Sequence, residues 1–179
     1  MSQQDTHVSL AHGNGGRFMR ELINELFARH LANPYLDTDT DAAVLPWNSA
    51  DGELVFTTDS FTVQPIEFPG GNIGSLAVHG TCNDLAMMGA RPLYLAAGFV
   101  LEEGLPFEVL DRILAAMGAT AKAAGVPIIA GDTKVVEQGK ADGVFINTNG
   151  IGLRRAGFAP TPERARPGQP IQGANARMR

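Results

Sequence analysis

Five aspartates lie beside apolar segments of the chain rather than in charged surface runs: Asp39, Asp41, Asp59, Asp84 and Asp132. Asp84 interrupts a stretch predicted to be helical, where aspartate has a low helix propensity and where its burial without a partner would be costly. A shared cation would offset that cost, and Mg²⁺ typically takes one or two carboxylates together with nucleotide phosphates. Each aspartate alone is better explained as a cap or turn residue, so the metal hypothesis rests on the group.

Lys134 follows Asp132 by two positions in an apolar stretch. If the backbone is extended there, the two side chains share one face of a strand. A carboxylate for a metal and an ammonium group for a phosphate would then point into one site, because lysine binds phosphate as a point charge. The alternative is a local surface ion pair, which contributes little to stability.

Residues 13–16, Gly13, Asn14, Gly15 and Gly16, form a glycine loop directly before a predicted helix. Glycines allow backbone N–H groups to approach an anion, and a helix N-terminus adds favourable partial charge. The spacing is neither that of a P-loop nor that of a dinucleotide-binding loop. A flexible loop before a helix explains the same residues. His12 could contact a nucleotide, but a loop histidine is the better interpretation.

The elements that position these residues follow from the hydrophobic periodicity of the chain. It predicts helices over residues 17–31, 74–88 and 106–124, and strands over 42–46, 54–58, 93–101, 126–136 and 144–153. This mixture predicts an α+β fold with a mixed, mostly antiparallel sheet and helices on one face. A second copy of the chain could cover the other face, which is a hypothesis of dimerisation.

Composition limits the classes of protein to which the chain can belong. Its 179 residues are 44% hydrophobic and 18% charged, which is typical of one globular domain. No transmembrane helix or signal peptide is predicted, and the single cysteine, Cys82, excludes an internal disulfide and is interpreted as a packed thiol. We therefore expect a cytoplasmic protein. The arginine-rich residues 157–179 are interpreted as a linker or disordered tail rather than a nucleic-acid-binding arm.

Seven segments, taken in order, resemble the HypE family of hydrogenase-maturation carbamoyl dehydratases. They are LAHGNGG (10–16), FTTDSF (56–61), FPGGNIG (68–74), GTCNDLAMMGARP (80–92), FVLEEGLP (99–106), GDTKVVEQG (131–139) and FINTNGIG (145–152). The resemblance covers about residues 8–155. Aminoimidazole ribonucleotide synthetase, selenophosphate synthetase and thiamine-phosphate kinase share some of these segments but match the others less well.

The resemblance implies an ATP-binding, dimer-forming N-terminal domain over residues 1–156, in which the sheets of two subunits pair into a barrel. The implied reaction is the ATP-dependent dehydration of a carbamoylated C-terminal cysteine to a thiocyanate, which supplies the cyanide ligands of NiFe hydrogenase. The implied partners are the carbamoyltransferase HypF and the HypC–HypD complex. Neither nucleic acid nor a membrane is expected as a partner.

The resemblance also assigns roles to individual residues. It implies that Mg²⁺ is held by Asp41, Asp59, Asp84 and Asp132, and that Lys134 acts in catalysis on the phosphate or the amide oxygen. It implies that ATP is bound by Gly13, Asn14, Gly15, Gly16, Asn83, Asp84, Asp132 and Thr133.

The sequence departs from the family pattern at its end. The family continues with a second domain and a tail that ends in the acceptor cysteine, whereas this sequence ends at Arg179. Cys82 is in the wrong place to replace that cysteine. We therefore expect the second domain to be absent. Two hypotheses stay open: the N-terminal part of a carbamoyl dehydratase, or a truncated, catalytically incomplete module for nucleotide binding and dimerisation.

Overall fold

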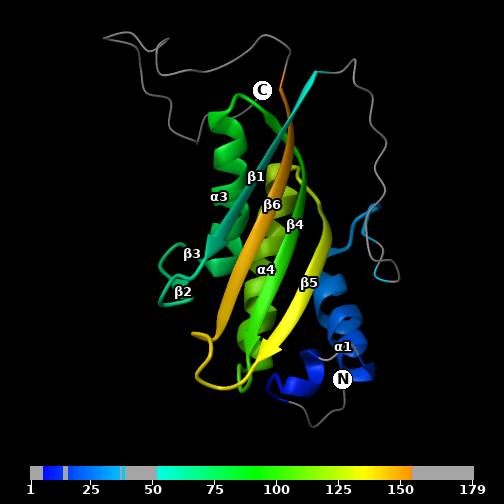
Figure 1. The fold of residues 1–179 in the computed structure, drawn as a ribbon, viewed down its shortest axis with the longest axis vertical. Helices are drawn as coiled ribbons and strands as arrows, with labels where there is room; N and C mark the ends of the chain where they lie inside the picture. Colours follow the sequence, from blue (N-terminus) through cyan, green and yellow to red (C-terminus); the bar gives the residue numbers. More distant parts are fainter. Residues whose placement is uncertain (1–5, 14–15, 37, 39–51, 155–179) are drawn as a thin grey trace.

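The computed structural model describes residues 6–13, 16–36, 38 and 52–154. In this part of the chain, two long helices lie behind a twisted four-stranded sheet, and a shorter helical segment flanks one side of the sheet (Figure 1). The strand predicted over 42–46 and the tail predicted over 157–179 lie outside the described residues. No helix in the described part is long and apolar enough to cross a membrane.

The sheet has the strand order β1-β6-β4-β5. The bounds are Glu53–Phe61 for β1, Arg91–Glu102 for β4, Ile128–Val136 for β5 and Val144–Arg154 for β6. β6 pairs antiparallel with both neighbours, whereas β4 and β5 are parallel. Parallel neighbours need a crossover, which α4 (Phe107–Ala124) provides. The predictions of a mixed, mostly antiparallel sheet and of these four strands are confirmed, with ends shifted by a few residues.

One face of the sheet is buried and the other is open. In β4 the buried positions alternate with partly exposed ones, and Leu95, Ala97, Phe99 and Leu101 point into the core. They meet apolar side chains of α3 (Ile73–Met87) and α4 (Phe107–Ala124). The period of two follows from the pleat of a strand with one face on a core. The prediction of helices on one face is therefore confirmed for the described residues.

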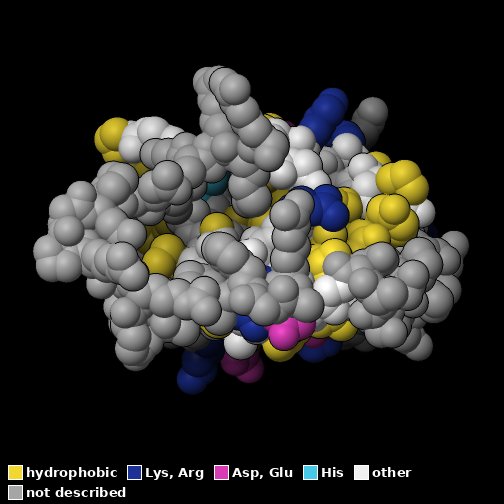
Figure 2. Space-filling view, turned by 90° about the horizontal axis from the view of Figure 1, so that it is seen from above, with side chains coloured by type: hydrophobic (Ala, Val, Ile, Leu, Met, Phe, Trp, Pro, Cys, Tyr) yellow, Lys and Arg dark blue, Asp and Glu magenta, His cyan; other side chains and the backbone are white. Residues whose placement is uncertain are grey.

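The open face carries large apolar side chains. Leu54 and Phe56 of β1 are 54% and 67% exposed. Phe56 lies opposite Ile151 of β6, which lies opposite Tyr94 of β4. Seen from the end of the domain where β1 begins and α3 ends, further hydrophobic side chains reach the surface (Figure 2), and Met87 and Met88 are among the exposed ones there.

The helix predicted over 17–31 is confirmed as one run of consecutive helical segments. It comprises α1 (Arg17–Leu22), a π-helical turn η2 (Ile23–Phe27) and α2 (Ala28–Leu31), and a short 3₁₀ turn η1 (Leu10–Gly13) precedes it. Asn33 follows the last turn and donates its side-chain amide to the carbonyls of Leu31, at 2.9 Å, and Ile128, at 2.7 Å. The same amide thus ties the end of the helix to the start of β5.

A short hairpin prepares the start of α3. It consists of β2 (Glu67–Phe68) and β3 (Gly71–Asn72), which pair antiparallel. Asn72 is the N-cap of α3, and its side-chain oxygen accepts from the N–H groups of Gly74 and Ser75. In turn, the Ser75 hydroxyl accepts a hydrogen bond from the Asn72 backbone N–H. This capping box satisfies N–H groups that have no partner inside the helix.

We predict that Asn72→Ala lowers the free energy of unfolding by about 1–2 kcal/mol, because a helix N-cap is lost. Urea denaturation followed by circular dichroism measures the change. Asn72→Asp keeps the capping oxygen but loses the bond from the Asn72 amide to the Arg112 carbonyl at 3.2 Å, so it is expected to retain only part of the stability. Equal stability of the alanine variant and the wild type would contradict the capping role.

Candidate functional site

One group of predicted site residues lies where β1 meets α3. The Thr57 hydroxyl donates to the Asp84 carboxylate at 3.2 Å. The Asp59 side chain lies beside α3, since a Cβ added at Gly80 would be 3.5 Å from its carboxylate. Asn83 and Asp84 are both exposed on the outer side of the helix. The expectation that Asp84 is buried is therefore wrong, because its position in α3 points away from the core.

A second group lies on β5, at the opposite edge of the sheet. The Lys134 ammonium is 3.1 Å from the Asp132 carboxylate, and their side chains are 61% and 63% exposed. The prediction that these two residues share one face is confirmed, and the ion pair that was the alternative is present as well. Such an exposed pair is weak, so both groups are free to exchange partners for a ligand. The side chain of Thr133, between them, is buried on the helix-covered face.

The glycine loop (residues 13–16) adjoins this second group. A Cβ at Gly13 would lie 2.6 Å from the backbone nitrogen of Val135, so only glycine allows this approach to β5. Gly16 is the N-cap of α1. Asn14 and Gly15 lie outside the described residues. The loop therefore begins beside the strand that carries Lys134.

His12 anchors the start of this loop. It is 3% exposed, its Nδ1 lies 2.9 Å from the Ser9 hydroxyl, and its ring packs edge-on against Phe18 and Phe107. Of the two interpretations that the sequence left open, the structure favours a loop histidine with a packing role over a nucleotide contact.

The side chains of the two groups do not gather in one place within the described chain. β6 and β4 lie between β1 and β5, which at the usual strand spacing is a separation of about 14 Å. Asp59 lies two residues before the buried Phe61 and therefore shares its helix-covered face of the sheet, whereas Asp132 lies opposite Gly98 on the open face. Among the described residues, no three histidine, cysteine or acidic side chains gather closely enough to hold a metal ion. Asp39 and Asp41 lie outside that part of the chain.

A polar row on the open face runs from Ser60 on β1 to Asp132 on β5 and was not predicted from the sequence. The register places Ser60, Asn147, Gly98 and Asp132 side by side across the four strands. The Asn147 amide donates to the carbonyl of Asp59 and to the Ser60 hydroxyl, both at 3.0 Å, and the Asn149 amide donates to the Asn147 side-chain oxygen at 3.2 Å. The alternation of asparagines with apolar residues in FINTNGI could have indicated this row.

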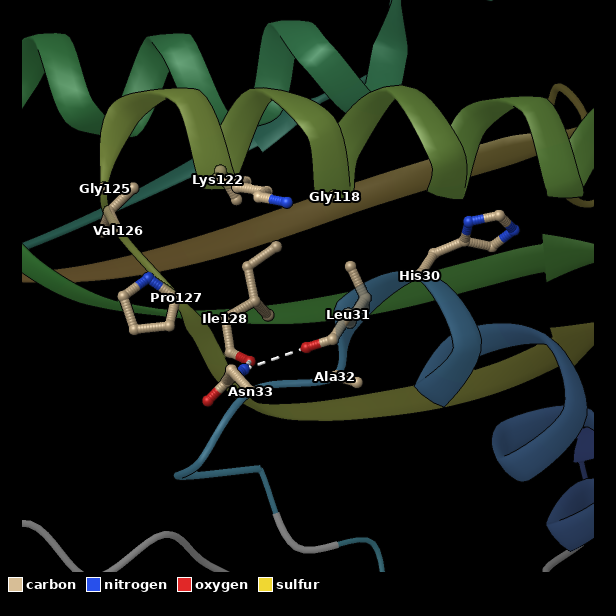
Figure 3. Close-up of a pocket in the computed structure, with 11 residues that line it drawn as sticks. His30, Leu31, Ala32, Asn33, Gly118, Lys122, Gly125, Val126, Pro127 and Ile128 are labelled. Carbon is tan, nitrogen blue, oxygen red and sulfur yellow. Dashed lines mark hydrogen bonds between the residues drawn. The ribbon is translucent and has the colours of Figure 1, made fainter.

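A pocket of about 360 Å³ lies elsewhere, between the end of α2, the end of α4 and the start of β5 (Figure 3). None of the predicted site residues lines it. The Asn33 amide in the wall of this pocket is turned toward the Leu31 carbonyl, as Figure 3 shows, and the His30 ring is hydrogen-bonded to the Asp111 carboxylate. Because Asn33 and His30 are already hydrogen-bonded within the protein, Lys122 alone does not indicate which ligand the pocket would bind. We therefore assign no catalytic group to this pocket.

Comparison with known proteins gives a consistent result. The model of the family "AIR synthase related protein, N-terminal domain" matches residues 39–154. A carbamoyl dehydratase HypE of Azotobacter vinelandii is 56% identical over 164 residues, which are 92% of this chain and 48% of that protein. This chain therefore spans about half the length of the curated relatives that it matches.

Two solved structures extend the comparison. The crystal structure of hydrogenase maturation protein HypE in complex with ATP has a TM-score of 0.83 and 55% identity, and covers 89% of this chain and 47% of its own. The crystal structure of a HypE–HypF complex has a TM-score of 0.57 and 54% identity, and covers 74% of this chain and 42% of its own.

Cys82 is the single cysteine of the sequence and lies in α3, partly buried. Burial disfavours the thiolate and raises the pKa of the Cys82 thiol to about 11. The Cys82 side chain packs against the apolar core, as expected for a packed thiol, and the raised pKa disfavours the reactive thiolate.

We predict that native Cys82 reacts with iodoacetamide at pH 8 about two orders of magnitude more slowly than an ordinary exposed thiol, since the thiolate fraction falls with the raised pKa. Mass spectrometry over a time course measures the rate, and urea-unfolded chain is the control that should react at the ordinary rate. Equal rates in the native and unfolded chain would contradict the burial of this thiol.

Proposed function

The chain belongs to the AIR synthase related family, whose N-terminal domain it contains, and from this we propose that it is the N-terminal, ATP-binding part of a HypE-type carbamoyl dehydratase. The observation that carries the proposal is the similarity to an ATP-bound HypE at 55% identity and a TM-score of 0.83. The proposed whole-protein reaction converts a carbamoylated C-terminal cysteine into a thiocyanate, with ATP as the dehydrating reagent.

This chemistry explains why phosphate-binding groups are needed. An amide oxygen is a poor leaving group until it is phosphorylated, and phosphoryl transfer depends on positioning and on stabilising the charge of the phosphates. Lys134 supplies an exposed cation beside Asp132. In the proposed site, Asp132 turns to the metal and Lys134 to the phosphates or the amide oxygen. The adjoining glycine loop offers backbone N–H groups, and Asn83 and the backbone of Thr133 help to hold the nucleotide.

Mg²⁺ suits the donor groups of the proposed site. Asp59, Asp84 and Asp132 offer hard carboxylate oxygens, which Mg²⁺ prefers. Asp84 is exposed, and among the described residues its carboxylate accepts one bond, from the neutral Thr57 hydroxyl, so oxygen lone pairs are left for a cation. Asp41 completes the proposed set. When bound with ATP, Mg²⁺ would neutralise phosphate charge, while these carboxylates orient it.

We further propose that the site is completed by a second copy of the chain. The carboxylates beside β1 and the Asp132–Lys134 pair on β5 lie at the two outer edges of one sheet. If the sheets of two copies pair edge to edge into a barrel, β1 of one copy meets β5 of the other, and both edges are removed from solvent. The apolar side chains of the open face, Leu54 and Phe56, would become buried inside such a dimer.

The proposed partners follow from the same relatives. A HypE–HypF complex of similar structure supports HypF as the source of the carbamoyl group. Delivery of the cyanide to a HypC–HypD complex and a cytoplasmic location are proposed from the family resemblance.

The second candidate function is nucleotide binding and dimerisation without turnover. It is favoured by the state of Cys82, because this partly buried thiol with a raised pKa does not suit the role of the carbamoylated acceptor. The chain is incubated with ATP, Mg²⁺ and a carbamoylated peptide that ends in cysteine, and mass spectrometry follows the loss of one water. Loss of water supports the dehydratase. ATP binding by calorimetry without that loss leaves the second candidate, and no binding overturns both.

Lys134→Ala is predicted to raise the dissociation constant for Mg-ATP about tenfold or more, which corresponds to about 1.4 kcal/mol, because a phosphate loses its cationic partner. Isothermal titration calorimetry measures it. Lys122→Ala removes a lysine from the distant pocket of Figure 3 and should leave the affinity unchanged. If both variants bind ATP like the wild type, Lys134 does not belong to the site.

Phe56→Asp is predicted to convert the dimer into a monomer at micromolar concentration, because a charge would be buried in the paired open faces. Light scattering after size-exclusion chromatography measures the mass. Met87→Asp is the matched control, since Met87 is 66% exposed but lies at the end of α3, and it should remain dimeric. A monomeric wild type, or a Phe56→Asp variant that stays dimeric, would contradict the barrel.

A further inference from the structure

Glu102, at the end of β4, holds both ends of the turn that joins β5 to β6. Its carboxylate accepts from the N–H of Gly139 at 2.5 Å and from the N–H of Gly143 at 2.8 Å, one bond to each oxygen. Its own backbone N–H donates to the Gly143 carbonyl at 2.8 Å. Hydrogen bonds to an ionised carboxylate are shorter and stronger than neutral ones. One side chain therefore fixes residues 139–143 relative to β4.

The residues next to Glu102 hold two further segments. The N–H of Glu103 donates to the carbonyl of Val136, the last residue of β5, at 2.9 Å. Gly104 donates to the carbonyl of Val8, and Val8 donates to that of Leu105, both at 2.8 Å. Residues 102–105 thus join the end of β5, the turn that follows it and the segment that leads into the glycine loop.

These segments carry groups of the proposed nucleotide site. Lys134 lies two residues before the end of β5, and Gly13 packs against Val135 between them. A displacement of the turn after Val136 would move the end of β5 and, with it, both the ammonium group and the start of the glycine loop. Glu102 itself touches neither group, so its effect on a ligand can only be indirect.

We propose that Glu102 is a positioning residue for the nucleotide site, which acts by fixing the β5–β6 turn and thereby the relative position of Lys134 and Gly13. This inference rests on the proposed function, since it concerns the same ATP site. Residues 137–140 of the turn are exposed. The N–H of Gly139 can therefore turn to water when the carboxylate is removed, and the fold loses little while the placement of the site is lost.

The test is the isosteric variant Glu102→Gln, whose amide nitrogen cannot accept a hydrogen bond. We expect faster hydrogen exchange at the N–H groups of Gly139 and Gly143, together with a dissociation constant for Mg-ATP raised about tenfold, because small misplacements at a site are costly. The melting temperature without ATP should fall only slightly, whereas the rise in melting temperature on adding ATP should shrink.

Glu67→Gln is the matched control. Glu67 also makes two hydrogen bonds, both at 2.9 Å, but to Arg112 and away from the proposed site. The Arg112 side chain lowers the pKa of the Glu67 carboxyl, mainly through the hydrogen bond. This variant should lose a comparable contact and bind ATP like the wild type.

The outcomes separate the two proposals. If the wild type binds ATP and Glu102→Gln binds it equally well, Glu102 is only a fold contact and the positioning role is overturned. If the wild type itself does not bind ATP, the proposed function fails, and the positioning role fails with it. Should Glu102→Gln not fold, Glu102→Asp decides: it keeps the charge but is too short to reach both N–H groups, and unchanged ATP affinity in that folded variant would overturn the inference.

Discussion

The packing of α3 and α4 against one face of the sheet is the interaction on which the rest of the structure depends. It requires very close approach at a few positions. A Cβ at Gly74 of α3 would lie 2.4 Å from the Ile113 carbonyl of α4, and one at Gly150 of β6 would lie 2.7 Å from the Thr81 methyl group of α3. Such contacts exclude larger side chains at these positions. They also determine which of the two alternating sets of residues in each strand faces the helices.

That packing leaves one face of the sheet without cover in the described part of the chain. The open face combines exposed apolar side chains with the polar row through Asn147, and the groups proposed to bind Mg-ATP lie at the edges, Asp84 beside β1 and Lys134 on β5. A nucleotide site confined to one chain would have to span the width of the sheet. The proposed site shared by two copies would account for both the exposed apolar face and the separation of the two groups.

Local patterns sufficed to predict the three helices, the four strands of the main sheet and the common face of Asp132 and Lys134, because periods of two and 3.6 residues reflect burial directly. The positions of Asp59 and Asp84 relative to β5 could not be predicted in this way. They depend on the strand order β1-β6-β4-β5, in which β1 and β5 are the two edge strands and therefore lie far apart in space. The contacts of Glu102 could not be predicted for the same reason, because its partners Gly139 and Gly143 lie 37 and 41 positions further along the chain.

The most direct test of the shared site is complementation between two defective chains. Asp84→Asn impairs the group beside β1, and Lys134→Ala impairs the group on β5. If each site takes one group from each copy, equal mixing with subunit exchange gives mixed dimers in which one site is intact, and about a quarter of the wild-type ATP sites should return. Calorimetry that finds no restored sites in dimers shown to have exchanged subunits would contradict the shared site and place all binding groups within one chain.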